Sequence, residues 1–102
     1  MKQVGRRDDV VRALRALRPD LERRGVRHAA LFGSIARGDD VLESDVDIIV
    51  DLDPSSDVGI FAFDELRSYL EARLGMAVDL GTRGSLQAGR HDEILRDLVT
   101  VF

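Results

Sequence analysis

Two aspartates separated by one valine stand in an otherwise apolar run, and their types and spacing suit them to chemistry. Asp45 and Asp47 flank Val46 where the apolar stretch VDIIV begins. Charged groups beside a packed sheet cost free energy unless a partner neutralises them. On a strand, residues at this spacing project from the same face, with their Cα atoms about 7 Å apart. The pair therefore predicts a site for a divalent cation, and magnesium prefers such carboxylate oxygens.

A third carboxylate, Asp79, lies in another short apolar run, MAVDL at residues 76–80. It joins the pair if this run forms a strand beside the one that carries Asp47. It would then bind metal or accept the proton of an attacking hydroxyl group. Two metal ions about 4 Å apart stabilise both the attacking and the leaving oxygen of phosphoryl transfer. The alternative is an exposed sheet face on which aspartates meet water, the interpretation that we favour for Asp51 and Asp53.

A glycine–serine pair supplies the other half of a candidate site. Gly33 and Ser34 directly follow the strand-like run RHAALF at residues 27–32. A helix that starts after such a turn leaves backbone N–H groups free to bind phosphate, and glycine lets the ligand approach closely. The Ser34 hydroxyl can donate a further hydrogen bond or cap the helix. Arg37, one helical turn on, can reach the same phosphates, although an ordinary turn and a solvent-exposed arginine are the alternatives.

Hydrophobic periodicity predicts alternating helices and strands that position these residues. Helices are expected over 8–24 with a break near Pro19, briefly after Ser34, over 58–74 and over 86–98. Strands are expected over 27–32, 46–52 and 76–80, followed by a loop over 81–84, and residues 99–102 form a tail or an edge strand. This alternation predicts a small α/β fold in which helices pack against one sheet. We expect Phe61, Phe63 and Tyr69 of the long helix to lie in the core.

The composition limits the classes of protein to consider. The chain has 102 residues, a net charge of −4 and no cysteine, so one domain over residues 1–102 is expected and thiolate metal sites are excluded. An acidic chain is a poor candidate for direct nucleic-acid binding. No apolar run is long enough to cross a bilayer and no secretory leader is visible, so a cytoplasmic protein without membrane contact is expected.

The spacing of these motifs resembles a known signature. Gly33-Ser34, ten intervening residues and then Asp45-Val46-Asp47 are similar to the GS-x10-DxD motif of the DNA polymerase β-like nucleotidyltransferase superfamily. The fuller stretch LFGSIARGDDVLESDVDIIVDL resembles the minimal nucleotidyltransferase (MNT) proteins, and the similarity covers nearly the whole chain. It implies a small single-domain nucleotidyltransferase fold, with a mixed β-sheet of three or four strands flanked by helices.

The resemblance also implies an activity and a site. Members of the superfamily transfer a nucleoside monophosphate from an NTP to a hydroxyl group and release pyrophosphate. By position, Gly33 and Ser34 would hold the triphosphate, and Arg37 is a weaker extension of this phosphate site. Asp45, Asp47 and Asp79 would be the catalytic acids and the ligands of Mg²⁺, in a site for two ions.

MNT proteins commonly pair with HEPN proteins, in which case the HEPN protein is a ribonuclease toxin and the MNT protein its antitoxin. The resemblance therefore implies an antitoxin that transfers AMP from ATP to a tyrosine of its HEPN toxin, in a hetero-oligomer with it. Two alternatives stay open. One is an antitoxin that only masks the toxin, and the other is a transferase that acts on a small molecule or an RNA end.

Overall fold

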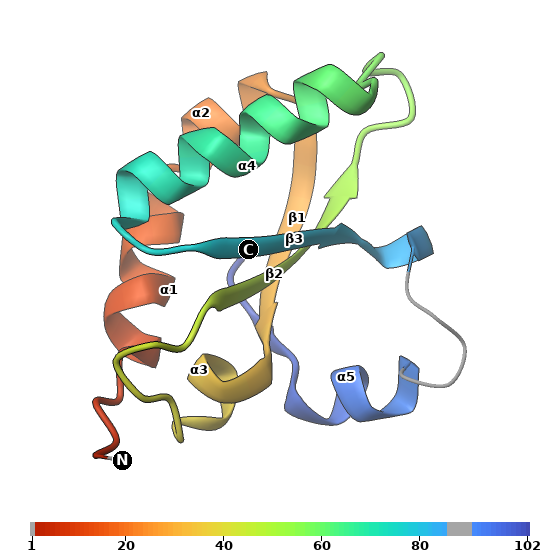
Figure 1. The fold of residues 1–102 in the computed structure, drawn as a ribbon. Helices are drawn as coiled ribbons and strands as arrows, with labels where there is room; N and C mark the ends of the chain where they lie inside the picture. The colour runs from red at the N-terminus through yellow and green to blue at the C-terminus, as the bar shows by residue number, and fades with distance from the viewer. Residues whose placement is uncertain (1, 86–90) are drawn as a thin grey trace.

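The computed structural model describes residues 2–85 and 91–102 of the chain (Figure 1). Along the chain the helices and strands alternate: α1 Arg7–Ala16, α2 Arg18–Arg23, β1 Val26–Phe32, α3 Gly33–Arg37, β2 Val46–Leu52, α4 Ile60–Leu74, β3 Val78–Thr82, a 3₁₀ turn Arg83–Ser85, α5 His91–Asp97 and β4 Val99–Thr100. None of the helices in these two ranges is long and apolar enough to cross a membrane.

The four strands form one mixed sheet in the order β3-β2-β1-β4. β1 pairs antiparallel with both β2 and β4, whereas β2 and β3 run parallel. A parallel pair needs a crossover connection, and α4 provides it between β2 and β3. The prediction of an α/β fold with a mixed sheet is thus confirmed, and the C-terminal residues form an edge strand rather than a free tail.

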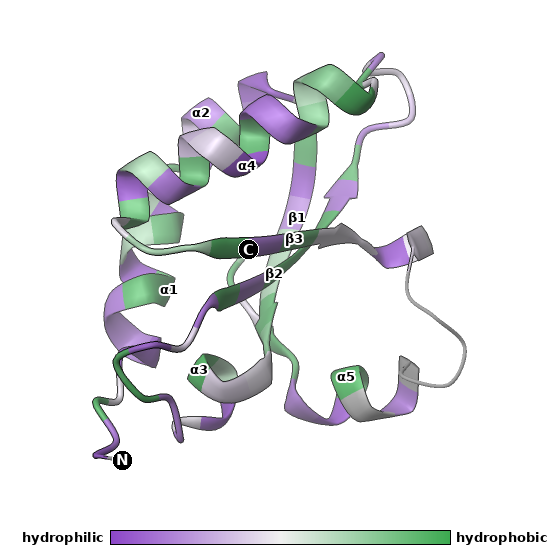
Figure 2. Ribbon diagram, in the orientation of Figure 1, coloured by the Kyte–Doolittle hydropathy of each residue, from purple (hydrophilic) through white to green (hydrophobic). Residues whose placement is uncertain are grey.

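The main core lies between the sheet and the helices α1, α2 and α4 (Figure 1). Figure 2 shows the hydrophobic residues concentrated along the strands, with polar residues on the outer faces of these helices. The alternating residues of β2 that face this core are Val46, Ile48 and Val50. Asp47 belongs to the opposite set, so the acidic side chains of β2 project from the other face of the sheet.

Several element boundaries differ from the expectation. The predicted break near Pro19 is confirmed, since α1 and α2 are separate helices, but the break itself lies at Leu17. Pro19 is the second residue of α2, where it lacks only an N–H that the first turn leaves unpaired anyway. β3 spans residues 78–82 rather than 76–80, and it includes the first two residues of the expected loop because its backbone pairs with β2 as far as Thr82. The predicted start of the last helix, residues 86–90, lies outside the described residues.

One member of the aromatic set was placed wrongly. Phe61 is 85% exposed, because its spacing from the buried Leu66 and Leu70 places it on the opposite side of α4. Its neighbour Ile60 is 80% exposed as well. Phe63 and Tyr69 are half-buried against the core. The Tyr69 hydroxyl donates a hydrogen bond to Asp20 Oδ2 at 3.0 Å, so the long helix is anchored to α2 by a polar contact as well as by packing.

A buried ion pair that the sequence did not predict fixes the segment between α3 and β2. The Asp40 side chain is fully buried, and its Oδ2 accepts a hydrogen bond of 3.0 Å from Arg6 Nε. Arg6 Nη2 also donates to the carbonyl of Val41 at 2.6 Å, and the Val4 N–H donates to the carbonyl of Asp40 at 2.9 Å. These bonds tie the N-terminal segment to the loop that leads to Asp45.

Replacing Arg6 with alanine should lower the free energy of unfolding by about 2 kcal/mol, because Asp40 would stay buried without its charged partner. Equilibrium unfolding in urea at pH 7 measures this change. Arg12→Ala is the matched control, since Arg12 forms an exposed ion pair with Asp9 on α1. An equal effect of the two substitutions would contradict the role of the buried pair.

The same pair predicts a dependence on pH. Burial acts to raise the pKa of Asp40, but the hydrogen bonds from Arg6 outweigh it and the pKa lies below its usual value of 3.8. Because the folded-state pKa is lowered, this contribution to stability is present above pH 3.8 and is lost as the pH falls through the folded-state value. In the Asp40→Asn variant, the free energy of unfolding should therefore fall less steeply as the pH is lowered below 3.8 than it does in the unsubstituted protein.

Candidate active site

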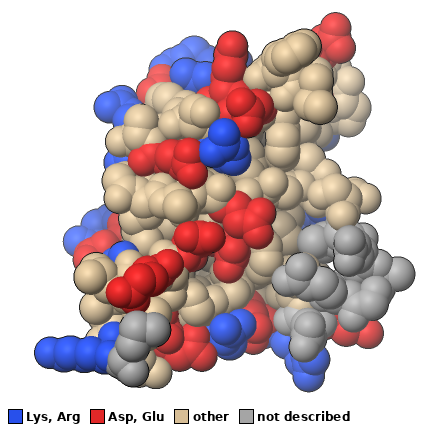
Figure 3. All heavy atoms as spheres, viewed as in Figure 1, with Lys and Arg blue, Asp and Glu red and all other residues tan. Residues whose placement is uncertain are grey.

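Asp47 and Asp79 meet on neighbouring strands. β2 and β3 are parallel, and in their register Asp47 is the direct partner of Asp79. Register partners in a sheet project from the same face, with the strands about 4.8 Å apart. The tertiary structure therefore brings together two carboxylates that are far apart in the sequence. Figure 3 shows acidic side chains gathered over β2 and β3 on this face.

Gly33 lies directly against the Asp47 carboxylate. Its backbone has a φ of +77°, a region that residues with a side chain rarely adopt. A Cβ built on Gly33 would overlap Asp47 Oδ2 and would lie 3.0 Å from Asp47 Cγ. Phe32, the residue before Gly33, is the register partner of Asp47 in β1. The turn between β1 and α3 and the acidic pair are thus parts of one site.

Asp45 lies just before β2 and is exposed. In the described part of the chain, no three histidine or acidic side chains gather closely enough to hold a metal ion among themselves. Magnesium is commonly bound by one or two carboxylates, with substrate phosphates and water as its other ligands. Asp47 and Asp79 offer two carboxylates on one face, so the donor set fits a magnesium ion that arrives with a triphosphate.

Ser34 and Arg37 both lie in α3, the short helix that begins at Gly33. Ser34 is the second residue of α3, and Phe32 occupies the N-cap position, so Ser34 is not the N-cap that the sequence offered as one possibility. Its half-buried side chain lines a pocket with Gly33 and Asp47. Arg37, the last residue of α3, borders the same pocket. The structure therefore collects four of the six predicted site residues around one pocket.

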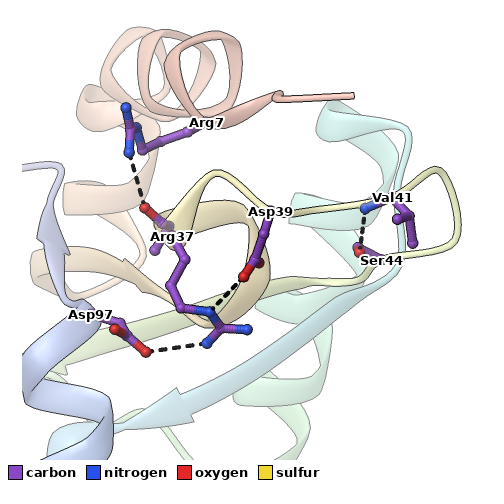
Figure 4. A network of polar contacts seen from close by, with 7 residues as sticks. Arg7, Arg37, Asp39, Val41, Ser44 and Asp97 are labelled. Atoms are coloured by element: carbon purple, nitrogen blue, oxygen red, sulfur yellow. Dashed lines mark hydrogen bonds and ion pairs between the residues drawn. The ribbon is translucent and has the colours of Figure 1, made fainter. Parts of the chain in front are cut away.

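Two carboxylates hold the Arg37 guanidinium (Figure 4). Nη1 donates a hydrogen bond to Asp97 Oδ2 at 3.1 Å and Nε donates one to Asp39 Oδ2 at 3.2 Å. These bonds, that to Asp97 first, raise the pKa of Arg37 above its usual value. Arg37 thus stays positively charged at the edge of a predominantly acidic site.

Helix α5 also lines the pocket, and the sequence did not predict that this helix belongs to the site. The pocket has a volume of about 500 Å³, and Ile94, Arg96 and Asp97 complete its lining. Asp97 is 60 residues from Arg37 in the chain. No spacing rule links positions so far apart, so no local sequence pattern could have predicted that α5 lines the pocket.

Asp51 and Asp53 take no part in this pocket, but neither simply faces water. Asp51 accepts a hydrogen bond from Arg83 Nε at 3.1 Å. Asp53 accepts bonds from the backbone N–H and the hydroxyl group of Ser55 at 2.9 and 2.8 Å. These partners explain the two acidic residues structurally, at the end of β2 and in the turn after it.

Comparison with known proteins agrees with this arrangement. The nucleotidyltransferase domain family matches residues 14–101. The chain is 46% identical over 82 residues to the protein adenylyltransferase MntA of Thermococcus cleftensis, an alignment that covers 78% of this chain and 79% of the relative. The family match over residues 14–101 contains the Gly33-Ser34 turn, both strands that carry Asp47 and Asp79, and the whole of α5.

Solved structures share the fold. One, assigned as a minimal nucleotidyltransferase, superposes with a TM-score of 0.73 at 28% identity and covers 89% of this chain and 92% of its own. Another, a tri-AMPylated HEPN toxin of Shewanella oneidensis in complex with an MNT antitoxin, matches with a TM-score of 0.59 at 21% identity, over 94% of this chain and 68% of that one. At that identity the second likeness concerns the fold alone.

Proposed function

Since the chain belongs to the nucleotidyltransferase domain family and is a nucleotidyltransferase, we propose that it is the antitoxin of a HEPN/MNT toxin–antitoxin module. In this proposal it transfers AMP from ATP to a tyrosine hydroxyl of its HEPN ribonuclease toxin and so inactivates the toxin. The observation that carries the proposal is the pairing of Asp47 with Asp79 beside the Gly33 turn.

Each residue of the candidate site has its own role in this proposal. Gly33 and Ser34 bind the triphosphate, since glycine leaves the backbone open to a phosphate group. Asp79 accepts the proton of the attacking hydroxyl group. The hydroxyl oxygen forms a bond to the α-phosphorus, and the bond from that phosphorus to the bridging oxygen breaks. Its electrons leave with pyrophosphate, so the acceptor gains AMP.

Asp45, Asp47 and Asp79 are the residues that would hold magnesium with the nucleotide. Magnesium, when bound, neutralises phosphate charge and stabilises the charge that develops in phosphoryl transfer. Without such a cation, the acidic face over β2 and β3 (Figure 3) would repel a triphosphate. The chain's own carboxylates therefore make nucleotide binding dependent on a divalent ion.

Three observations support a protein as the acceptor. The relative from Thermococcus cleftensis is a protein adenylyltransferase, and the fold is shared with a complex of a HEPN toxin and an MNT antitoxin. The pocket also borders solvent, since the exposed Arg96 of α5 belongs to its lining. A side chain presented by a partner protein can therefore reach it.

The test is intact-mass spectrometry of the product of the neighbouring gene after incubation with this protein, ATP and Mg²⁺. We expect a mass gain in whole AMP units, and no gain with Asp45→Ala/Asp47→Ala as the enzyme. A neighbour that is silenced by a stable complex, with no gain in mass, would instead establish masking without catalysis. A gain on RNA or on a small molecule alone would overturn the proposed acceptor.

A further inference from the structure

The contact between Arg37 and Asp97 lies where a triphosphate would have to bind. Asp97 borders the same pocket as Gly33 and Ser34, and its Oδ2 accepts the hydrogen bond from Arg37 Nη1. The other carboxylate on Arg37, that of Asp39, does not line the pocket. Figure 4 shows the guanidinium between these two acids, with Asp97 approaching from α5.

A phosphate group and Asp97 cannot both lie close together in this pocket without repulsion. Both are anions, and like charges a few ångströms apart repel each other even beside solvent. A guanidinium offers five N–H donors and binds phosphate oxygens as readily as carboxylate oxygens. If a phosphate oxygen replaces the Asp97 carboxylate as the acceptor of the Arg37 Nη1 hydrogen bond, the repulsion is relieved. The hydrogen bond from Nε to Asp39 is retained.

We propose that Asp97 competes with the phosphates of the nucleotide for Arg37 and thereby sets the affinity for the Mg²⁺–ATP complex. This inference rests on the proposed function, since it concerns the same pocket. In the free protein the contact joins α3 to α5 across the pocket. Nucleotide binding then breaks the contact between Arg37 and Asp97 in the last turn of α5, so α5 is held to α3 by this ion pair only while the site is empty.

The test measures equilibrium binding of Mg²⁺–ATP by calorimetry with the full chain. Asp97→Asn keeps the shape of the side chain and removes its charge, and it should tighten binding about three- to fivefold, the range of an exposed ion pair. Asp39→Asn is the matched control, because Asp39 contacts the same guanidinium from outside the pocket. Its effect should stay within about twofold.

A double-mutant cycle with Arg37→Gln separates competition from plain charge repulsion. If Asp97 acts by occupying Arg37, Asp97→Asn should lose most of its effect in the Arg37→Gln background. An unchanged effect there, or weaker binding by Asp97→Asn alone, would overturn the inference while leaving the proposed function intact. Absence of saturable Mg²⁺–ATP binding by the unsubstituted protein would instead overturn the proposed function, and the inference with it.

Discussion

Replacing Asp47 with asparagine should lower the rate of AMP transfer about a thousandfold, because it removes a carboxylate at the centre of the site. Asp47 is the register partner of Asp79 and lies against the Gly33 turn, so it lies beside both halves of the pocket. Asparagine keeps the shape of the side chain but lacks the negative charge that attracts a cation. The loss should therefore appear in the rate of transfer and not in the fold.

The mass-spectrometric assay of the partner protein, followed over time, gives the rate. Asp51→Asn is the matched control: Asp51 lies on the same face of β2, about 13 Å along the strand from Asp47, and pairs with Arg83. This control should retain nearly full activity. Equal losses in the two variants would show that general charge on the sheet face, and not the pair Asp47–Asp79, supports the reaction.

Replacing Gly33 with alanine should damage both stability and activity. Alanine at a φ of +77° is strained by about 1–2 kcal/mol, and its Cβ would overlap the Asp47 carboxylate. Together these effects should lower the free energy of unfolding by about 3 kcal/mol. A carboxylate displaced by about 1 Å should also slow transfer about a hundredfold in the molecules that remain folded.

Urea unfolding and the transfer assay, run on the same preparation, measure the two effects. Gly84→Ala is the control, because Gly84 is exposed, has no positive φ and has open space where a Cβ would lie. It should change neither quantity appreciably. A Gly33→Ala protein with normal stability and normal transfer would show that the close approach of the turn to Asp47 is not required.

The sequence by itself determined most of the secondary structure and the chemistry-bearing residues. β2 spans the predicted residues 46–52, and α3 ends at Arg37 before a left-handed glycine, as the local pattern indicates. These features depend on neighbours in the chain: alternation, helical spacing and glycine at a turn. For the same reason, the Gly33-Ser34 turn and the pair Asp45 and Asp47 could be recognised before any fold was known.

One aromatic residue was assigned to the core wrongly, for a reason that lies within its own helix. Leu66 and Leu70 are buried and mark the face of α4 that packs on the core. Phe61 lies nine residues before Leu70, and at about 3.6 residues per turn this spacing places it on the opposite side of the helix. An apolar side chain on a helix is therefore expected in the core only where its spacing matches that of the buried face.

Only the tertiary structure decided which distant residues meet. The register of β2 against β3 places Asp79 beside Asp47, and the packing of α5 places Asp97 on Arg37. The buried pair Arg6–Asp40 joins residues 34 positions apart in the same way. Each contact requires a choice of strand order and helix placement by the whole core, which buries apolar surface without regard to sequence distance. Local patterns name the groups that can react, and the packing of the chain decides which of them react together.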